Sequence, residues 1–298
     1  MMDIIQKMRN KAKELLEQEE VKLVIGWEKG TFWYQSPPVF ITSPDDVDRL
    51  VWDQFCINNL SKYLLDYKHL EGKIALFVKG CDARGVNRLL QDQQISRDKL
   101  VILGVPCPGM KDAEAAKKAK EDQVDQLPLA ERCADCITPN PMVFDELIAD
   151  EVAVAEIDET KRFEKVLQLE EKAPDERYDF WKSQYDKCIR CFACRNVCPA
   201  CNCRECCFDL AEPEWLGKRV VTSENQFFAL TRAMHVAGRC IECGECERVC
   251  PMDIPIMSLN KKIIKDINTL FGDYGAGMDL EDKPPLGKYD ENDPEEFM

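Results

Sequence analysis

The cysteine pattern C-x2-C-x2-C-x3-C-P occurs twice in this chain of 298 residues, over residues 188–199 and again over residues 240–251. Steps of three residues let one tight loop direct three thiols at the corners of a single compact metal site. The fourth cysteine of each copy stands further along and precedes a proline, so we do not expect it to bend back to that site. Each fourth cysteine is then left to complete the site of the other copy, which constrains how the two segments can fold.

This spacing is that of ferredoxins with two 4Fe–4S clusters. Structural zinc sites use two C-x2-C pairs rather than three consecutive steps and a C-P, so two complete copies favour iron–sulfur clusters over zinc. We predict that one cluster is held by the first cysteine set, which is Cys188, Cys191, Cys194 and Cys250. The other is predicted on the second cysteine set, which is Cys240, Cys243, Cys246 and Cys198.

The chain around these two copies is predicted to be helical. A capping-box pattern that begins at Ser223 indicates a helix start, and Phe227, Leu230 and Met234 then fall on one helical face. A further helix is expected after the second copy, with Gly272 as its end. The domain resembles the all-helical ferredoxin domain of succinate dehydrogenase iron–sulfur subunits and heterodisulfide reductase C subunits. That resemblance implies electron transfer between partner subunits.

The first half of the chain has the alternation of an α/β domain. Continuous apolar runs at residues 74–78 and 99–105 predict buried strands. The helical segment 86–95 lies between them, so the strands are expected to be parallel neighbours. A helix is also expected over residues 45–66. We therefore predict an α/β domain with a partly parallel sheet over residues 1–160.

Cysteines follow both of these predicted strands. Cys81 comes after the first strand, Cys107 after the second, and a C-x2-C pair follows at residues 133–136. The carboxyl edge of an open α/β sheet is where ligands bind, and amides at a helix start near Cys81 favour a thiolate. A four-ligand metal site is predicted here, against the alternative of cysteines that only pack in a core. The N-terminal cysteine set comprises Cys81, Cys107, Cys133 and Cys136.

The N-terminal cysteine set resembles that of the beta subunits of deazaflavin-reducing hydrogenases and deazaflavin-dependent formate dehydrogenases. The matching stretches are KGCDARG, GVPCPGM and ERCADC, within about residues 70–140, and the cysteine run at 198–206 is similar to the formate dehydrogenase members. The resemblance implies a third 4Fe–4S cluster on this set. It also makes a flavin a candidate cofactor. The residues themselves do not indicate flavin binding, because no glycine-rich stretch precedes Cys81 or directly follows Cys136, where the chain reads ITPNPMVFDELIAD, and no G-x-G-x-x-G motif occurs.

Five cysteines stand outside the three sets. Cys56 is most simply a core residue. The other four could pack around the first cysteine set, hold a further cluster, or form a redox-active dithiol: Cys201, Cys203, Cys206 and Cys207. Five arginines beside the predicted ligands either offset cluster charge and raise reduction potentials, or are ordinary surface residues: Arg190, Arg195, Arg204, Arg239 and Arg248. His69 and His235 lie in no metal-like or triad-like context.

The net charge of −15 disfavours nucleic acid and anionic lipid as partners. No apolar run reaches the ~18 residues of a membrane-spanning helix, and the N-terminus lacks the apolar core of a secretory signal, so we expect a cytoplasmic protein. In a reducing compartment, 17 cysteines indicate metal or redox chemistry rather than disulfides. The expected organisation is an α/β domain (1–160), a helical two-cluster domain (161–272) and an acidic tail (273–298).

Together these observations predict an iron–sulfur electron-transfer subunit of an anaerobic oxidoreductase complex. Electrons would pass through three 4Fe–4S clusters between partner redox subunits. The expected partners are heterodisulfide-reductase-like, formate dehydrogenase or hydrogenase subunits, with electron bifurcation as one use. No catalytic residue is assigned, so whether the chain itself is an enzyme stays open. Two alternatives are a flavoprotein that moves hydride to or from a deazaflavin or nicotinamide, and a disulfide reductase that uses Cys201–Cys207.

Overall fold

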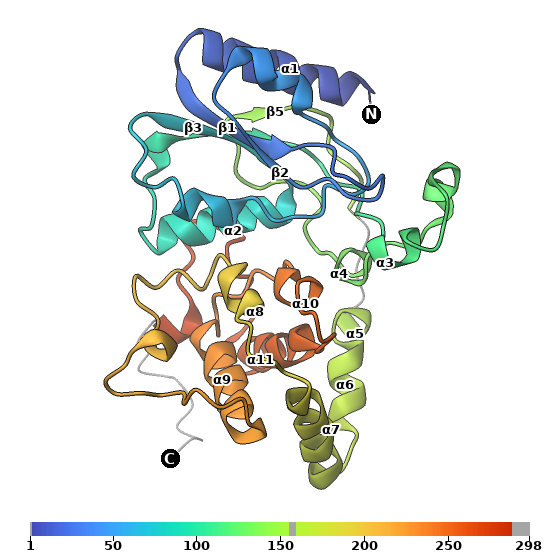
Figure 1. Ribbon diagram of the computed structural model, residues 1–298, viewed down its shortest axis with the longest axis vertical. Coiled ribbons are helices and arrows are strands. Elements are labelled where there is room, and N and C mark those ends of the chain that lie inside the picture. The colour runs from blue at the N-terminus through green and yellow to red at the C-terminus, as the bar shows by residue number, and fades with distance from the viewer. Residues whose placement is uncertain (1, 155–158, 288–298) are drawn as a thin grey trace. The chain divides into compact units, whose positions relative to one another are not determined.

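The computed structural model describes residues 2–154 and 159–287. The chain divides into two compact units, Met1–Ile157 and Asp158–Met298. The first unit contains a mixed sheet with helices, and the second is mainly helical (Figure 1). The predicted fold class is therefore confirmed. The end of the predicted acidic tail and residues 155–158 of the predicted α/β domain lie outside the described residues.

The first unit is built on a five-stranded sheet with the order β2-β1-β3-β4-β5. β1, β3, β4 and β5 are parallel to their neighbours, and β2 pairs antiparallel with β1 at the edge. Ile74 pairs with Leu100 and Val78 with Gly104, so β3 and β4 end side by side. Both strands are buried along nearly their whole length, as their apolar runs predict. The strands are β1 (Val21–Trp27), β2 (Pro38–Ile41), β3 (Lys73–Val78), β4 (Leu100–Gly104) and β5 (Glu146–Leu147).

Helices α1 and α2 lie on opposite faces of this sheet (Figure 1). Their buried side chains join those of the strands in one continuous hydrophobic core, which includes Met8 of α1, Trp27 of β1, Phe77 of β3 and Val86 of α2. The helices of this unit are α1 (Met2–Glu17), α2 (Gly80–Gln91), α3 (Ala113–Ala116) and α4 (Glu131–Ala134). The short 3-10 helices are η1 (Pro44–Arg49), η2 (Ser61–Leu65), η3 (Arg97–Lys99) and η4 (Glu121–Gln126).

The helix expected over residues 45–66 is wrong, because only the two 3-10 segments η1 and η2 form there. Asp53 lies between them. Its carboxylate accepts a hydrogen bond from the backbone N–H of Phe55 at 2.8 Å and another from the hydroxyl of Ser36 at 2.7 Å. Local bonds from an aspartate side chain to backbone compete with helical hydrogen bonding, so the segment turns instead of continuing as a helix.

The second unit packs its helices around the cysteine loops. α7 packs against α9, and α11 contacts α6, α9 and α10. The helices are α5 (Glu159–Arg162), α6 (Glu164–Glu170), α7 (Pro174–Asp186), α8 (Ala193–Asn196), α9 (Thr222–His235), α10 (Glu245–Arg248) and α11 (Ile256–Phe271). Two 3-10 helices, η5 (Cys207–Asp209) and η6 (Pro285–Gly287), complete it. Within the described ranges, none of the helices combines the length and apolar character needed to cross a bilayer.

Helix α9 presents its predicted apolar face to the outside. Phe227, Leu230 and Met234 are 40%, 53% and 62% exposed. The inward positions belong instead to Asn225, Phe228, Arg232 and Ala233, which are buried. Two polar residues on the inward side of a helix indicate that the interior of this unit is not an ordinary hydrophobic core.

Gly80, at the junction of β3 and α2, is held by the close approach of another segment. A Cβ added at this position would lie 1.8 Å from the backbone oxygen of Thr138 and 2.9 Å from that of Asn140. A backbone oxygen cannot move aside as a flexible side-chain end can, so only glycine fits where this segment passes the start of α2.

We expect Gly80→Ala to destabilise the first unit by at least the ~1–3 kcal/mol typical of overpacking. The measurement is thermal unfolding of the purified protein under anaerobic conditions. Gly287→Ala serves as the control, because its added Cβ would meet nothing closer than 4.0 Å. Equal melting temperatures for Gly80→Ala and the wild type would contradict the close approach.

Candidate iron–sulfur sites

The two cysteine loops of the second unit have the same backbone conformation. In the first loop, Arg190 and Phe192 adopt left-handed conformations with φ of 54° and 59°. In the second loop, the equivalent residues Glu242 and Gly244 have φ of 58° and 66°. A one-turn helix follows each loop, α8 in the first and α10 in the second. Left-handed residues other than glycine cost free energy, so the surrounding structure must hold both loops in this shape.

These left-handed turns direct backbone amides at cysteine sulfurs. The thiol of Cys188 accepts a hydrogen bond from the backbone of Arg190, and Cys240 accepts one from Glu242. Cys243 accepts one from the backbone of Glu245. In each case the donor lies two residues beyond the cysteine. Amides gathered in this way form a concavity that binds anions, including the sulfurs of iron–sulfur clusters.

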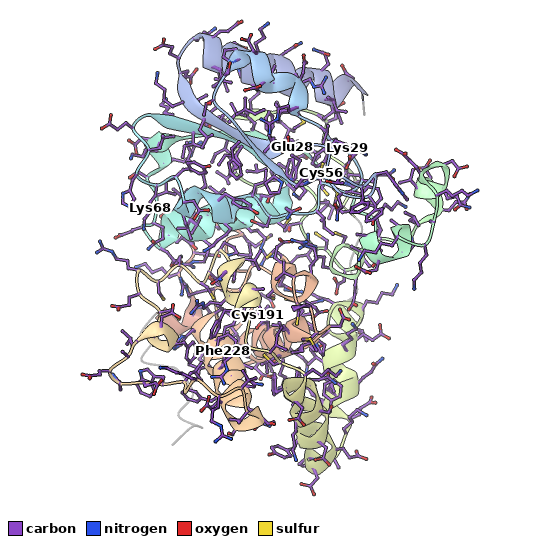
Figure 2. All side chains as sticks on the ribbon, viewed as in Figure 1. Glu28, Lys29, Cys56, Lys68, Cys191 and Phe228 are labelled. Carbon is purple, nitrogen blue, oxygen red and sulfur yellow. The ribbon has the colours of Figure 1, made fainter. Side chains whose placement is uncertain are left out.

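The first cysteine set lies around one cavity. Cys188, Cys191, Cys194 and Cys250 all line it, together with Pro251. Burial raises the pKa of Cys188 and of Cys194, and repulsion from Cys250 and Cys191 raises both further. The structure thus brings the last cysteine of the second motif to the first three of the first motif. Figure 2 labels Cys191, which is exposed, and Phe228, another residue that lines this cavity.

The second cysteine set is also gathered in one place. Burial raises the pKa of Cys240 to about 12, and repulsion from Cys198 adds to this effect. Cys198 likewise raises the pKa of Cys243 and Cys246 beyond the effect of their burial. Asn260 of α11 donates a hydrogen bond to the sulfur of Cys246 at 3.8 Å. The fourth cysteine of the first motif therefore lies with the first three cysteines of the second.

Neighbouring helices position the loops through polar contacts. Asn225 of α9 donates from its amide to the carbonyls of Tyr185, at 3.0 Å, and Cys188, at 2.9 Å. The guanidinium of Arg162 forms a two-armed ion pair with Glu242, with N–O distances of 2.9 and 2.5 Å. One contact fixes the start of the first loop, and the other fixes a left-handed residue of the second loop.

The donor chemistry of both sets fits 4Fe–4S clusters. Where burial raises the pKa of a thiol, as at Cys194 and Cys246, the thiolate forms only when a cationic centre offsets its charge, and soft thiolates favour iron–sulfur clusters or zinc. Among the described residues, no three His, Cys, Asp or Glu side chains converge on a point that could hold a single metal ion. In a 4Fe–4S cluster each cysteine binds a different iron, so its ligands surround a cube instead of converging on one atom.

The N-terminal cysteine set gathers at the carboxyl edge of the sheet, in the first unit. Cys81 begins α2 after β3, and Cys107 follows β4. Burial raises the pKa of Cys107 to about 12, and repulsion from Cys133 and Cys136 contributes to that rise. Burial also raises the pKa of Cys81, and repulsion from Cys136 contributes to that rise. Since the same soft donors surround one place, this set also fits a cluster.

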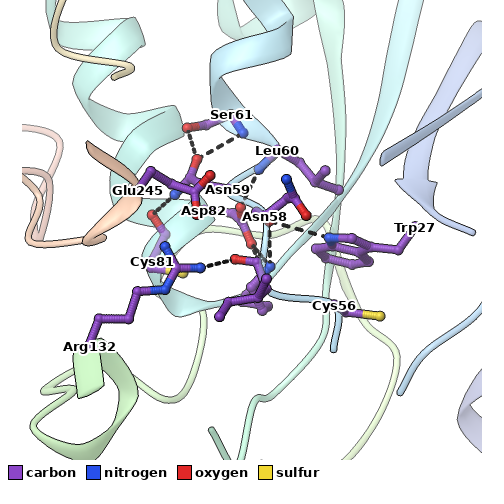
Figure 3. Close-up of polar contacts among 12 residues, drawn as sticks. Trp27, Cys56, Asn58, Asn59, Leu60, Ser61, Cys81, Asp82, Arg132 and Glu245 are labelled. Carbon is purple, nitrogen blue, oxygen red and sulfur yellow. Dashed lines mark hydrogen bonds and ion pairs between the residues drawn. The ribbon is translucent and has the colours of Figure 1, made fainter. Parts of the chain in front are cut away.

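A buried polar network supports the segment that carries Cys81 (Figure 3). Asp82, with no exposed surface, accepts hydrogen bonds from the backbone N–H of Leu60 at 2.5 Å and of Lys79 at 2.9 Å. The ammonium of Lys79 pairs with the same carboxylate at 2.9 Å. Asn59 donates from its side chain to the carbonyl of Cys81 at 2.9 Å. These bonds tie the start of α2 to the segment around residue 60.

The remaining cysteines separate into three environments. Cys56 is fully buried in the hydrophobic core, where its sulfur accepts a bond from the N–H of Asp53 at 3.3 Å (Figure 2). The thiol of Cys201 donates a hydrogen bond to Cys198, which lowers the pKa of Cys198. Cys206 contacts Cys207, whose pKa is raised by burial and by repulsion from Cys206 and Cys203.

The flanking arginines are engaged mainly by carboxylates and backbone carbonyls. Arg190 pairs with Glu224 at 2.8 Å, and Arg248 pairs with Glu245 at 2.8 Å. Arg195 pairs with Asp209 at 2.8 Å. The predicted flanking arginines do not include Arg232 of α9, which lies eight residues before Cys240 and outside both motifs, and which the fold brings to the cysteines.

Comparison with known proteins now defines the class of this chain. A family model described as a 4Fe-4S dicluster domain matches residues 187–255, which contain both cysteine loops. The chain thus carries a 4Fe–4S dicluster domain, which places it among the iron–sulfur proteins.

Two curated proteins show the relatives that this chain is similar to. The F420-dependent formate dehydrogenase subunit beta of Methanocaldococcus jannaschii is 25% identical over 353 aligned positions, covering 92% of this chain and 92% of the relative. The F420-dependent formate dehydrogenase 1 subunit beta of Methanococcus maripaludis is 25% identical, covering 92% of this chain and 91% of the relative. The resemblance to deazaflavin-dependent formate dehydrogenase beta subunits is confirmed.

The exchange of the fourth cysteines can be tested by counting iron in double variants. Cys250→Ala and Cys188→Ala each remove one ligand of the first cysteine set, so the double variant should lose about four irons, as each single variant does. Cys250→Ala combined with Cys240→Ala damages both sets and should lose about eight irons. If each motif holds its own cluster instead, Cys250→Ala with Cys240→Ala would lose about four irons, and Cys250→Ala with Cys188→Ala would lose about eight.

For the N-terminal cysteine set, we expect Cys107→Ala to lower the iron content by about four atoms per chain. The spectra of the other clusters should not change. Cys56→Ala is the matched control, because Cys56 is buried in the same unit but lies in the hydrophobic core. If Cys107→Ala and Cys56→Ala retain the same iron content, the four cysteines only pack.

Proposed function

We propose that this chain is an electron-relay subunit of an anaerobic oxidoreductase complex, with one 4Fe–4S cluster on each of the three cysteine sets. Bound clusters supply one-electron transfer, and the protein contributes the thiolates, the amides that point at them, and a dry surrounding. The arrangement of the two sets in the second unit carries the proposal. Cys194 of the first set raises the pKa of Cys246 of the second, so the two sites are close neighbours.

An exposed edge of the first cysteine set supports a relay between subunits. Cys191 is exposed, and Ile189 beside it is 53% exposed. In the second set, Cys246 is buried. We therefore place the entry or exit of electrons at the Cys191 side, where a partner can approach, and not at Cys246.

The partners we propose are other redox subunits of a formate dehydrogenase, hydrogenase or heterodisulfide-reductase-like complex. The two relatives are named as beta subunits of F420-dependent formate dehydrogenases, and nearly their whole length aligns with this chain. The aligned region of 353 positions is longer than this chain of 298 residues, so the M. jannaschii relative carries segments that this chain lacks. A flavin, and any bifurcation at it, is assigned to a partner subunit.

We also propose a reducing, cytoplasmic setting. None of the 17 cysteines forms a disulfide in the structure, although several lie close enough to affect one another. An oxidising compartment would convert such neighbours into disulfides and remove the ligands of the clusters. The net charge of −15 supports protein partners rather than nucleic acid.

Cofactor analysis of the anaerobically purified chain tests the proposal. We expect about twelve irons per chain, no stoichiometric flavin, and three reversible one-electron reductions in a redox titration. A content of about eight irons per chain would show that the N-terminal cysteine set holds no cluster. One flavin per chain would contradict the relay and favour hydride transfer to a deazaflavin or nicotinamide. Disulfide reduction that is lost in Cys206→Ser with unchanged cluster spectra would favour a disulfide reductase.

A further inference from the structure

Arg232 is a buried cation on the inward face of α9. It is 4% exposed, and it follows the buried residues Asn225 and Phe228 at helical spacing on that face. Arginine is rarely so buried unless a partner compensates its charge, because removing a guanidinium from water is costly. We therefore expect groups that compensate the charge of Arg232 to lie close to it.

The groups around Arg232 come from both cysteine sets of the second unit. Its Nη2 donates a hydrogen bond to the carbonyl of Cys194 at 3.1 Å, and Arg232 lines the cavity of the first cysteine set. On its other side it interacts with the sulfurs of Cys198 and Cys246, which belong to the second set. Cys201 interacts with it as well. The guanidinium thus lies between the two sets.

Arg232 differs from the other buried arginines of this unit in having no carboxylate partner among the described residues. Arg162 pairs with Glu242, and Arg190 pairs with Glu224. Nε of Arg232 has no hydrogen-bond partner in the described part of the chain. Burial disfavours the charged form of Arg232, and the sulfurs of Cys246, Cys198, Cys201 and Cys194 favour it.

We propose that Arg232 is a positioning residue whose fixed positive charge raises the reduction potentials of both 4Fe–4S clusters in the second unit; this rests on the proposed function. Reduction adds negative charge to a site, and a nearby cation stabilises the reduced form most strongly where water is excluded. Since Arg232 faces ligands of both sets, one side chain acts on both clusters. It also offsets the mutual repulsion of two adjacent anionic sites.

The test is an anaerobic redox titration of the full chain, followed by electron paramagnetic resonance. In Arg232→Gln, the midpoint potentials of both clusters in the second unit should shift to more negative values, while that of the N-terminal cluster stays unchanged. Arg232→Lys keeps the charge and should recover most of the shift. Arg190→Gln is the matched control, and because Arg190 is already paired with Glu224 its effect should be smaller and confined to the first cysteine set.

Three outcomes would overturn the proposal. Unshifted potentials in Arg232→Gln would show that the charge has no effect, and an equal shift in Arg232→Lys and Arg232→Gln would show that shape matters instead. If Arg232→Gln fails to assemble clusters, Arg232→Lys and Arg232→Met are compared. Cluster assembly in Arg232→Lys but not in Arg232→Met supports the need for a positive charge. Failure of assembly in both variants overturns the proposal. A wild-type chain without iron in residues 188–250 would overturn the proposed function as well. Intact clusters with unshifted potentials overturn only the role of Arg232.

Discussion

The exchange of cysteines between the two loops of the second unit is the constraint on which that unit depends. Neither loop brings four thiols together by itself, so α9, α10 and α11 must pack in a way that presents each loop to the other. The hydrophobic clusters around the loops are small, with three buried residues in each of two separate groups. With so little apolar packing, bound clusters would contribute directly to the folding free energy of this unit.

The backbone of the loops offsets part of the electrostatic cost of bringing these thiols together. Left-handed residues at equivalent positions of both loops turn amides toward the sulfurs, and Arg232 adds a full charge between the two sets. Gly244 adopts the left-handed conformation at little cost, but Phe192 at the equivalent position does not. The ring of Phe192 packs against Phe228, which helps to hold that conformation. Packing and ligand geometry in the first loop therefore depend on each other.

How much of the molecule could be predicted depends on how local each signal is. The buried strands β3 and β4 follow from apolar runs, and the helical character of the second half follows from periodicity and caps. The helix expected over 45–66 does not form, because Asp53 makes side-chain bonds that no periodic pattern reveals. The direction of the apolar face of α9 is a second feature that a periodic pattern does not reveal. Periodicity finds the stripe of Phe227, Leu230 and Met234, but it does not say that the interior needs Asn225 and Arg232.

For the sites, cysteine spacing alone is enough to predict three sets of thiols, since steps of three residues and paired strand ends restrict which sulfurs can meet. The motifs that carry the family resemblance in the sequence are the same short stretches, although the relatives align over 92% of the chain. Three-dimensional packing adds what spacing does not contain, namely the closeness of Cys194 to Cys246 and the buried guanidinium between the two sets. The physical reason is the separation along the chain of the residues that interact. Ligand spacing is a property of a few consecutive residues, whereas Arg232, 34 residues beyond Cys198 and eight before Cys240, meets both cysteine sets only after α9 has packed against the two loops.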